Sequence, residues 1–344
     1  MSMHSRTFRM KIMLGCLLGL FVGILTSSAC ANSSAVVLMY HRFGESEFPS
    51  TNTTVTQLDS HIAELTSGQY VVLPLETIVS KLNNGQSLPD RTIGISIDDG
   101  YKSIYTTAWP KFRAASLPFT VFIATGHIDQ RSSRHLSWDE IREMRNAGVG
   151  FGHHTVSHLH MPLAETSRIK AEINDAQNRF KKELGATPKL FAYPYGEASV
   201  SVISTIKEAG FAAAFGQHSG VIGSSEDMFY LPRFSMNETY GDMGRLRLAL
   251  NALPLTVKDV TPPDHLVNDI NPPSIGFTVT GHTGNLNRLS CFLSNIGRAE
   301  VVKLRSRIEV RTNQKFKKGR TRLNCTIPTA KNRWRWYGRQ FFVK

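Results

Sequence analysis

The apolar run over residues 93–97 ends in two adjacent carboxylates, Asp98 and Asp99, and Gly100 follows them. Two carboxylates this close disfavour each other's ionisation, and a bound cation relieves that repulsion. One carboxylate can bind the cation while the other accepts a proton from water held beside it. The alternative is an aspartate pair that only caps the next helix.

A pair of histidines follows another apolar run, residues 149–152. His154 and His158 are four residues apart, so on a helical turn they would project from one face and share a metal ion. Such a histidine pair alone is weak evidence for a metal site. Together with the two carboxylates it is much stronger evidence. Two histidines and one carboxylate leave coordination positions open for water and substrate, as a catalytic metal requires.

The elements that must position these residues are short strands. Apolar runs rich in β-branched and aromatic residues alternate with amphipathic segments, as buried parallel strands alternate with helices. The runs cover residues 36–40, 70–73, 93–97, 119–123, 149–152, 190–193 and 211–215. The clearest helix carries an apolar stripe from Ile169 to Leu184 and ends at Gly185.

This alternation predicts an α/β fold, a distorted (β/α) barrel over residues 32–252. An open doubly wound sheet is the competitor, but the chain has no glycine-rich phosphate-binding motif that would favour it. Because the carboxyl ends of barrel strands share one rim, the carboxylates and the histidines are expected at a common site.

The pattern changes near residue 253. Paired prolines punctuate an expected linker over residues 253–273, and a small β-sandwich-like domain is expected over residues 274–344. Its predicted strands cover residues 274–280, 288–293, 300–310 and 320–326.

The first 31 residues are typical of a secretory signal peptide. Basic residues precede an apolar run over residues 12–25, and small residues lead to an expected cleavage site near Ala31. We therefore expect a secreted or periplasmic protein without a stable membrane span. A lipoprotein signal that lipidates Cys30 and an uncleaved N-terminal anchor are alternatives. In an oxidising compartment Cys291 and Cys325 are expected to form a disulfide, with two buried free thiols as the alternative.

The formal net charge of +13 belongs to the C-terminal region. Residues 298–344 contain fifteen Lys or Arg against Glu300 and Glu309, whereas residues 1–297 are neutral. This imbalance predicts contact with an anionic envelope glycan, and export argues against nucleic acid as the partner. A solvated basic face that only aids solubility is the alternative.

Aromatic residues lie among these arginines. Trp334, Trp336 and Tyr337 could stack on sugar rings, or the tryptophans could share an inward face as core.

The two motifs resemble a known family. The sequence S-I-D-D-G at residues 96–100 is similar to the T-F-D-D-G signature of the polysaccharide deacetylases, carbohydrate esterase family four. The sequence H-T-V-S-H at residues 154–158 matches the His-Ser/Thr-x-x-His motif of that family. The resemblance covers roughly residues 35–240 and implies the same barrel.

The resemblance also implies roles for these side chains. Asp98 corresponds to the general base, and Asp99, His154 and His158 correspond to ligands of a divalent metal ion, for which zinc is expected. Tyr101 is expected to contact substrate.

A third family motif, Arg-x-Pro-Tyr-Gly, is only partly present. Pro194, Tyr195 and Gly196 match it, and they are expected to contact the substrate, with the Tyr195 N–H facing the oxyanion. Ala192 replaces the arginine that orients the catalytic aspartate. Arg233 is a candidate substitute, and a surface arginine is the alternative.

A general acid is needed to protonate the leaving amine. His41 follows Tyr40 at the end of the first predicted strand, and similar Tyr-His elements in the poly-N-acetylglucosamine deacetylase branch imply the acid role for it. A packing histidine is the alternative. Other histidines are interpreted as neighbours without a role: His153, His160 and His218.

The resemblance implies a metal-dependent hydrolase that removes acetyl groups from N-acetylhexosamine units of a polysaccharide. An acetylxylan-type O-deacetylase uses the same chemistry and is an alternative. A catalytically silent secreted glycan-binding protein is another, because of Ala192 and the basic aromatic tail. The sequence does not identify the polymer or the metal.

Overall fold

The structure is a computed structural model that describes Met1 and residues 33–223, 226–281, 283–330 and 332–344. The expected signal peptide therefore lies outside the described residues. From Ser33 onward the described residues belong to one compact unit. None of the described helices combines the length and apolar character that a membrane crossing needs.

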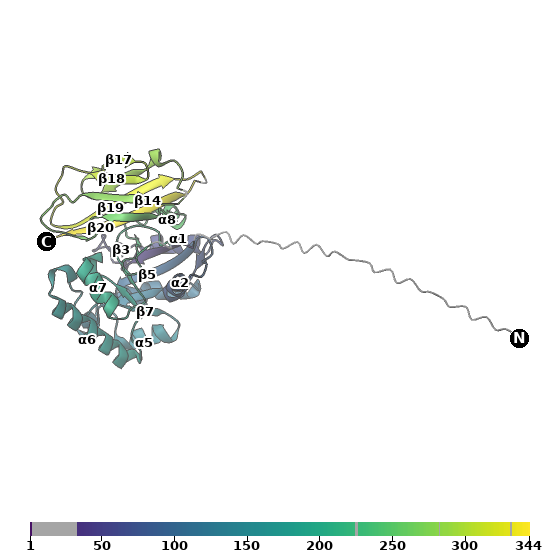
Figure 1. Ribbon diagram of the computed structural model, residues 1–344. Helices are drawn as coiled ribbons and strands as arrows, with labels where there is room; N and C mark the ends of the chain where they lie inside the picture. Colours follow the sequence, from purple (N-terminus) through teal and green to yellow (C-terminus); the bar gives the residue numbers. More distant parts are fainter. Residues whose placement is uncertain (2–32, 224–225, 282, 331) are drawn as a thin grey trace. The chain divides into compact units, whose positions relative to one another are not determined.

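A sheet of parallel strands forms the first part of this unit (Figure 1). Its neighbours follow the order β10 (Phe234–Ser235), β1 (Ala35–Tyr40), β5 (Thr92–Asp99), β6 (Thr120–Ile123), β7 (Gly150–His153), β8 (Leu190–Ala192) and β9 (Ala213–Phe215), and β4 (Val71–Val72) pairs with the start of β5. Every residue of β1 and β5 is buried, which explains the unbroken apolar runs in the sequence.

The segment between β9 and β10 closes the barrel with irregular backbone. The Gly216 N–H donates to the Leu231 carbonyl at 2.8 Å, and Ala35 and Ile222 exchange backbone hydrogen bonds of 3.0 and 2.9 Å. These hydrogen bonds connect the β9 side of the sheet to the β1 side without a regular β-ladder between them. The predicted distorted (β/α) barrel is thus confirmed, and the open doubly wound sheet is not formed.

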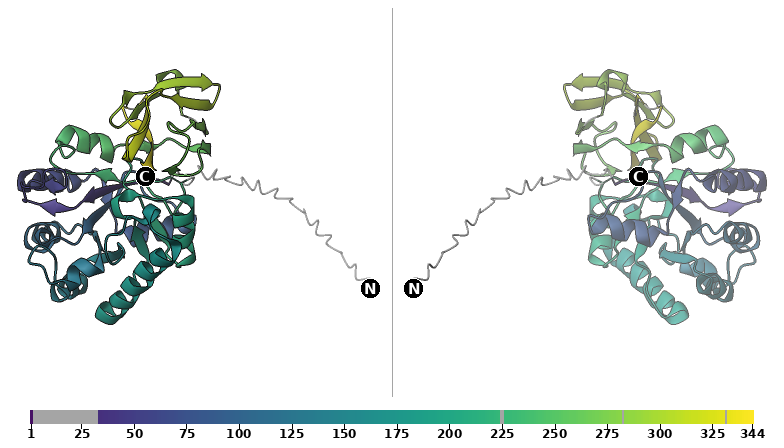
Figure 2. Two further views of the ribbon diagram at one scale, coloured as in Figure 1. Left: turned by 90° about the vertical axis from the view of Figure 1, so that its left-hand side faces the viewer. Right: turned by 90° about the vertical axis from the view of Figure 1, so that its right-hand side faces the viewer.

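Helices pack around the outside of this sheet (Figure 2). They are α1 (Val55–Leu65), α2 (Leu75–Asn83), α3 (Trp109–Ala114), α4 (Thr125–Asp129), α5 (Trp138–Asn146), α6 (Thr166–Leu184), α7 (Val200–Glu208) and α8 (Met243–Leu250), with short helical turns η1 (Ile104–Ala108), η2 (Met161–Leu163) and η3 (Pro194–Gly196). Helix α6 buries Ile169, Ile173 and Phe180 and ends at Gly185, whose φ of 73° suits glycine. This is the stripe and stop that the sequence predicts.

The predicted strands of the barrel each overlap an observed one, with ends that shift by one or two residues. The run over residues 211–215, for example, becomes β9 only from Ala213. Strand β10 was not predicted, because two residues are too short for a periodic pattern. A short parallel pair, β2 (Arg42–Phe43) and β3 (Asn52–Thr53), follows β1.

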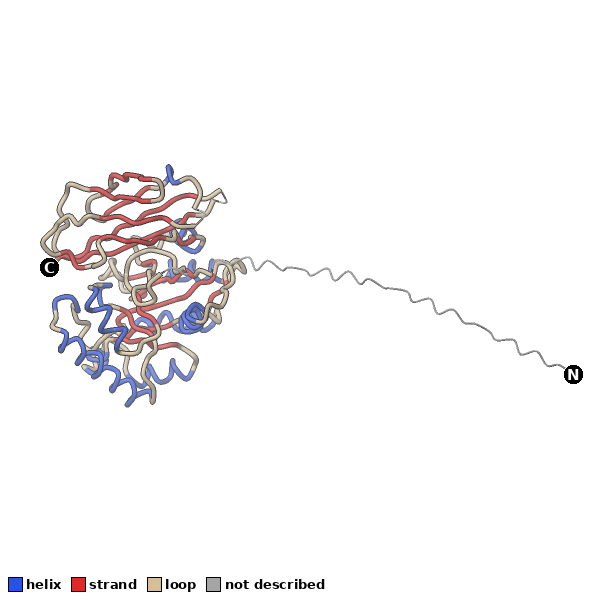
Figure 3. Tube along the Cα trace, viewed as in Figure 1, coloured by secondary structure: helices blue, strands red, loops and turns tan. Residues whose placement is uncertain are grey.

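The C-terminal part is built mostly of strands joined by loops (Figure 3). One sheet has the order β11 (Leu253–Pro254), β20 (Trp334–Val343), β19 (Gly319–Pro328), β15 (Ser290–Leu293) and β16 (Gly297–Arg298), with β13 (Leu266–Val267) also paired to β20. Another has the order β12 (Val257–Thr261), β14 (Ile275–Val279), β18 (Arg307–Arg311) and β17 (Glu300–Leu304), and the turn η4 (Leu286–Arg288) precedes β15. Phe277, Ile308, Leu323 and Phe341 belong to one apolar core.

Residues 253–273 differ from the linker that the sequence predicts. They contain β11, β12 and β13, and these strands pair with β20 and β14. Pro254 is tolerated because β11 pairs only with β20, so its missing N–H faces away from the ladder. The predicted strand over residues 300–310 is a hairpin of β17 and β18 that turns at Arg305, where φ is 59°.

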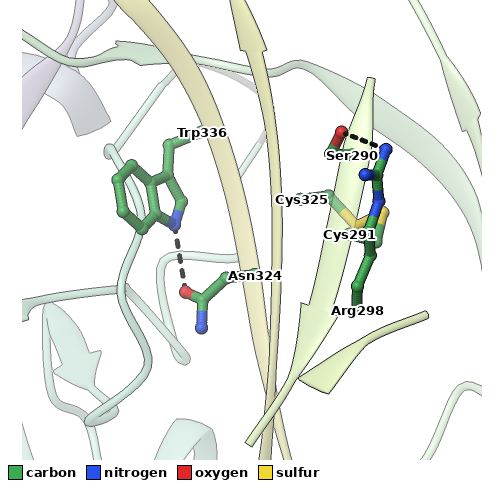
Figure 4. The surroundings of a disulfide bond; sticks show 6 residues. All are labelled: Ser290, Cys291, Arg298, Asn324, Cys325 and Trp336. Carbon is green, nitrogen blue, oxygen red and sulfur yellow. Dashed lines mark hydrogen bonds between the residues drawn. A yellow bond between two sulfur atoms is a disulfide. The ribbon is translucent and has the colours of Figure 1, made fainter. Parts of the chain in front are cut away.

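Cys291 and Cys325 form the expected disulfide, which joins the paired strands β15 and β19 (Figure 4). The nearby Trp336 donates its indole N–H to Asn324 and packs edge-on against Phe234 of β10, with ring centres 5.1 Å apart. Tyr337 is buried against Phe277. Both of these rings pack against other parts of the protein. Trp334 is 37% exposed, however, so the two tryptophans do not share the buried inward face that the packing alternative expected.

Candidate active site

A cavity of about 560 Å³ lies where β1 and β5 end. His41, Asp99, Tyr101, His158 and Tyr195 line it, so residues from strand ends far apart in the sequence meet there. This is the rim at which barrel folds carry their reacting groups.

Asp99, His154 and His158 form the candidate metal centre. Their ligand atoms all lie within 4.8 Å of one another, and the Nε2 atoms of His154 and His158 lie 3.4 and 3.2 Å from Asp99 Oδ1. Asp99 and His154 are buried, and His158 is half-buried.

The donor chemistry of His154 fits a cation. Its Nδ1 lies 2.7 Å from the Ala192 carbonyl, which can only accept, so Nδ1 carries the proton and Nε2 offers a lone pair. Nε2 is buried and has no hydrogen-bond partner among the described residues. A buried acceptor facing a carboxylate acceptor is unfavourable unless something positive lies between them.

The loop that carries these histidines is not the helical turn that the spacing suggested. Residues 154–158 are irregular, and Thr155 and His158 have φ values of 66° and 56°. Asp99 also has a positive φ, 74°. Such backbone conformations are costly for residues other than glycine and are concentrated at functional sites.

Glu172 of α6 holds this loop and was not anticipated from the sequence. Its Oε2 accepts from the Val156 and Ser157 N–H groups, both at 2.8 Å, and its Oε1 accepts from the Ser157 hydroxyl at 2.8 Å. Arg168 also donates to Oε1 at 2.6 Å. Glu172 could have been found from the sequence, because it is a carboxylate that lies beside Ile169 and Ile173 in the apolar stripe of α6.

Asp98 is held by Arg233 inside the barrel. The guanidinium Nη1 and Nη2 donate to the two carboxylate oxygens at 2.7 and 2.8 Å, and both side chains are completely buried. Arg233 also donates to the Gly216 carbonyl at 2.8 Å and to Ser96 Oγ at 3.1 Å. Arg233 is therefore not the surface arginine of the alternative interpretation.

The charge of Asp98 follows from these contacts. Burial raises its pKa, but the positive charge and hydrogen bonds of Arg233, together with nearby His154, outweigh burial and hold the pKa below its usual value. Asp98 is thus a carboxylate at neutral pH, able to accept a proton.

His41 lies in the same cavity, with Nε2 3.9 Å from Asp98 Oδ2. Burial lowers its pKa, and the carboxylates of Asp99 and Asp98 offset only part of that effect. Gln217, another residue that the sequence did not single out, lines the cavity and lies 3.5 Å from the same Asp98 oxygen.

Tyr195 is held in an unusual conformation in η3, with a φ of 59°. Its ring stacks on His160 at 3.9 Å, and His160 donates to Glu197 at 2.7 Å. Pro194 and Gly196 are buried beside it. Of the residues expected to contact substrate, Tyr101 and Tyr195 line the cavity.

The C-terminal part supports this turn. Gln340 of β20 donates from Nε2 to the Tyr195 carbonyl at 3.1 Å and to the Gly196 carbonyl at 2.8 Å. Arg320 and Arg322 of β19 line the cavity. No sequence pattern indicates these contacts, because nothing local links β19 and β20 to residues 194–196.

Three further histidines differ in their surroundings. His153 is buried and bonded to the Ile173 carbonyl at 3.1 Å, and His218 is buried against Tyr230. His127, which follows β6, lines the cavity and was missed. Its position just after the predicted strand over residues 119–123 was a usable signal.

Comparison with known proteins identifies related chains. Residues 85–214 match the family described as polysaccharide deacetylase. The poly-beta-1,6-N-acetyl-D-glucosamine N-deacetylase of Staphylococcus aureus is 26% identical over 234 residues, which cover 60% of this chain and 80% of that protein.

Solved structures share the fold. The Streptococcus pyogenes deacetylase PplD, in complex with acetate, has a TM-score of 0.59 at 19% identity and matches 64% of this chain and 99% of its own. IcaB from Ammonifex degensii has a TM-score of 0.58 at 21% identity and matches 63% of this chain and 97% of its own. The matched residues and both motifs place residues 85–214 with the polysaccharide deacetylases, and the solved structures share the barrel fold.

Proposed function

We propose that this protein is a hydrolase that removes acetyl groups from N-acetylhexosamine units of a polysaccharide with the help of a divalent metal ion. The observation that carries the proposal is the largely buried cluster of Asp99, His154 and His158 beside an ionised, arginine-bound Asp98. The relative from Staphylococcus aureus, named as an N-deacetylase of poly-β-1,6-N-acetylglucosamine, supports the substrate class.

Asp99, His154 and His158 would hold the metal ion, and zinc suits two imidazoles and one carboxylate. The hydrogen bond from His154 Nδ1 to the Ala192 carbonyl fixes the ring so that Nε2 points at the site. When bound, such an ion polarises the acetyl carbonyl and lowers the pKa of water.

Asp98 is the proposed general base. Arg233 fixes both of its oxygens and keeps the carboxylate ionised, so Asp98 can accept a proton from the attacking water. In this role Arg233 is the orienting arginine that position 192 lacks.

His41 is the proposed acid, because it lines the cavity with its Nε2 3.9 Å from Asp98 Oδ2 and can pass a proton to the departing amine nitrogen. The Tyr195 N–H would stabilise the oxyanion that forms on the acetyl group. Acetate and a free amino sugar result.

We further propose that the protein acts outside the cytoplasm, in the periplasm or after secretion. The signal-like N-terminal sequence supports this location. The disulfide between Cys291 and Cys325 supports it too, because structural disulfides persist in oxidising compartments.

Acetate release tests the function. The purified protein is loaded with zinc and incubated with β-1,6-linked N-acetylglucosamine oligomers, and with acetylated xylan oligomers in parallel. We expect acetate from the N-acetylated oligomers, loss of that release with a chelator and its return with added metal. Release from xylan alone would favour the O-deacetylase alternative, and no release from either, at any metal loading, would overturn the proposal.

A further inference from the structure

Two arginines of the C-terminal part lie in the wall of the candidate active site. Arg320 and Arg322 stand two positions apart on β19, so both side chains leave the same face of the strand. Both line the cavity that also contains Asp99 and Tyr195.

These cations have little to neutralise them. Among the described residues Arg322 makes no ion pair, and its Nε instead donates to Gln340 Oε1 at 3.0 Å. The carboxylate nearest to Arg320 is Glu197, at 3.9 Å from Nε, and Glu197 is already bonded to His160 at 2.7 Å. Asp99, the carboxylate that lines the cavity, faces His154 and His158 instead.

The two positively charged arginines also repel each other. Burial lowers the pKa of Arg322, and the positive charge of Arg320 lowers it further. A partly buried guanidinium beside a second cation is stabilised by an anion that can accept from both. Among the described residues, no carboxylate is hydrogen-bonded to either guanidinium, and Glu197 alone lies within ion-pair distance of one of them, Arg320.

Their position is fixed relative to the reacting groups. Gln340 links Arg322 to the Tyr195 and Gly196 carbonyls, and Arg320 Nη1 lies 3.4 Å from the Tyr195 carbonyl. The Tyr195 ring in turn contacts His158 of the metal centre, with ring centres 4.3 Å apart. An anion bound by the arginines would thus lie close to the hexosamine whose acetyl group reacts.

We infer that the preferred substrate is an anionic polysaccharide, in which a unit next to the N-acetylhexosamine carries a carboxylate or a phosphate that Arg320 and Arg322 bind. This inference rests on the proposed deacetylase function and specifies its substrate class. Tyr101, Tyr195 and Tyr240 also line the cavity, so aromatic side chains adjoin the space that the neighbouring sugars would occupy.

Matched oligosaccharides test the inference. The first probe alternates glucuronate with N-acetylglucosamine, the second carries phosphate on alternate units, and the third is a neutral N-acetylglucosamine oligomer of equal length. We expect kcat/KM to be about 10- to 100-fold higher for an anionic probe than for the neutral one, the range of a charge-assisted hydrogen bond. The advantage should shrink as salt rises, because the cavity is open to solvent.

Variants connect the preference to the two arginines. In Arg320→Gln with Arg322→Gln, the ratio of kcat/KM between anionic and neutral probes should fall to near unity, while Arg322→Lys should keep part of it. The matched control, Arg298→Gln with Arg311→Gln, removes the same charge from exposed positions outside the cavity and should keep the ratio.

A binding measurement separates this inference from the function on which it rests. Calorimetry with the fully de-N-acetylated uronate oligosaccharide should show binding to the wild type and loss in the Arg320→Gln, Arg322→Gln protein, whether or not acetate is ever released. Equal kcat/KM for all three probes, or a preference unchanged in the double variant, would overturn the inference and leave the deacetylase function standing. Absence of acetate from every probe would instead count against the function.

Discussion

Asp98 is bound on both oxygens by a guanidinium that is itself completely buried. A buried ion pair of this kind is costly to break from one side, because the partner charge is then left without compensation. The arrangement fixes the direction of the carboxylate as well as its charge. Residue identity at position 233 therefore controls the reactivity of position 98.

Asp98→Asn should lower kcat by about 10²- to 10⁴-fold, the usual contribution of a general base. The amide cannot accept a proton from water, but the metal ligands are untouched, so elemental analysis should find the same metal content as in the wild type. Because Arg233 loses its counter-charge, the melting temperature of the variant should also fall. The kinetics should therefore be measured well below that melting temperature. Turnover near the wild-type rate would remove Asp98 from the base role.

Helix α6 shapes the metal centre through a single side chain. Burial raises the pKa of Glu172, but the hydrogen bonds from Ser157 and Val156 outweigh it and lower the pKa, so the carboxylate is charged at neutral pH. It accepts from the backbone between His154 and His158, where the loop has no regular structure of its own.

Glu172→Gln should therefore weaken metal binding by about 10- to 100-fold, as loss of an outer hydrogen-bonding partner does at metal sites. Titration with zinc against a competing chelator measures this. Asp175→Asn, an exposed change on the same helix, is the matched control and should bind metal normally. An unchanged affinity in Glu172→Gln would show that the loop keeps its shape without the carboxylate.

Strand β20 contributes in a similar way to the turn at Tyr195. Gln340→Leu removes the two donors that reach the Tyr195 and Gly196 carbonyls, each worth about 1 kcal/mol. We expect kcat/KM on a neutral N-acetylated oligomer to fall by about tenfold, mainly through kcat, because the turn orients the oxyanion donor. Gln314→Leu, in an exposed loop, is the control. A change confined to KM would contradict an orienting role.

Across the whole molecule, the C-terminal sheets contribute to the site as well as to stability. The disulfide closes a separation of 34 residues and pins β15 to β19, the strand that carries Arg320 and Arg322. By the chain-entropy relation, closing such a loop stabilises the folded state by about 3 to 4 kcal/mol.

Cys291→Ser with Cys325→Ser should thus lower the denaturant midpoint of the C-terminal part, and added reductant should shift the wild type to the same midpoint without affecting the variant. Fluorescence of Trp334 and Trp336 can report on this region if Trp109 and Trp138 are first replaced by Phe. A midpoint that does not respond to reductant would mean that the sheets are stable without the bond.

The sequence alone determined where most barrel strands lie along the chain, the stripe and stop of α6, and the positions of Asp98, Asp99, His154 and His158 near strand ends. Each of these features depends on local periodicity or on short spacing, which can be recognised without knowing the tertiary contacts. The sequence was a poorer guide to residues 253–273, whose prolines suggested a linker although edge strands tolerate them.

Only the tertiary structure decided which distant residues complete the site. Arg233 reaches Asp98 across 135 residues of sequence, and Arg320 reaches the Tyr195 carbonyl across 125. These contacts depend on how the barrel closes and on where β19 and β20 meet its rim. Neither feature produces a local pattern in the sequence. Sequence spacing can place a reactive side chain at the end of a strand. The opposite charge that sets the protonation state of that side chain comes from a residue distant in sequence, and only the folded structure shows which residue it is.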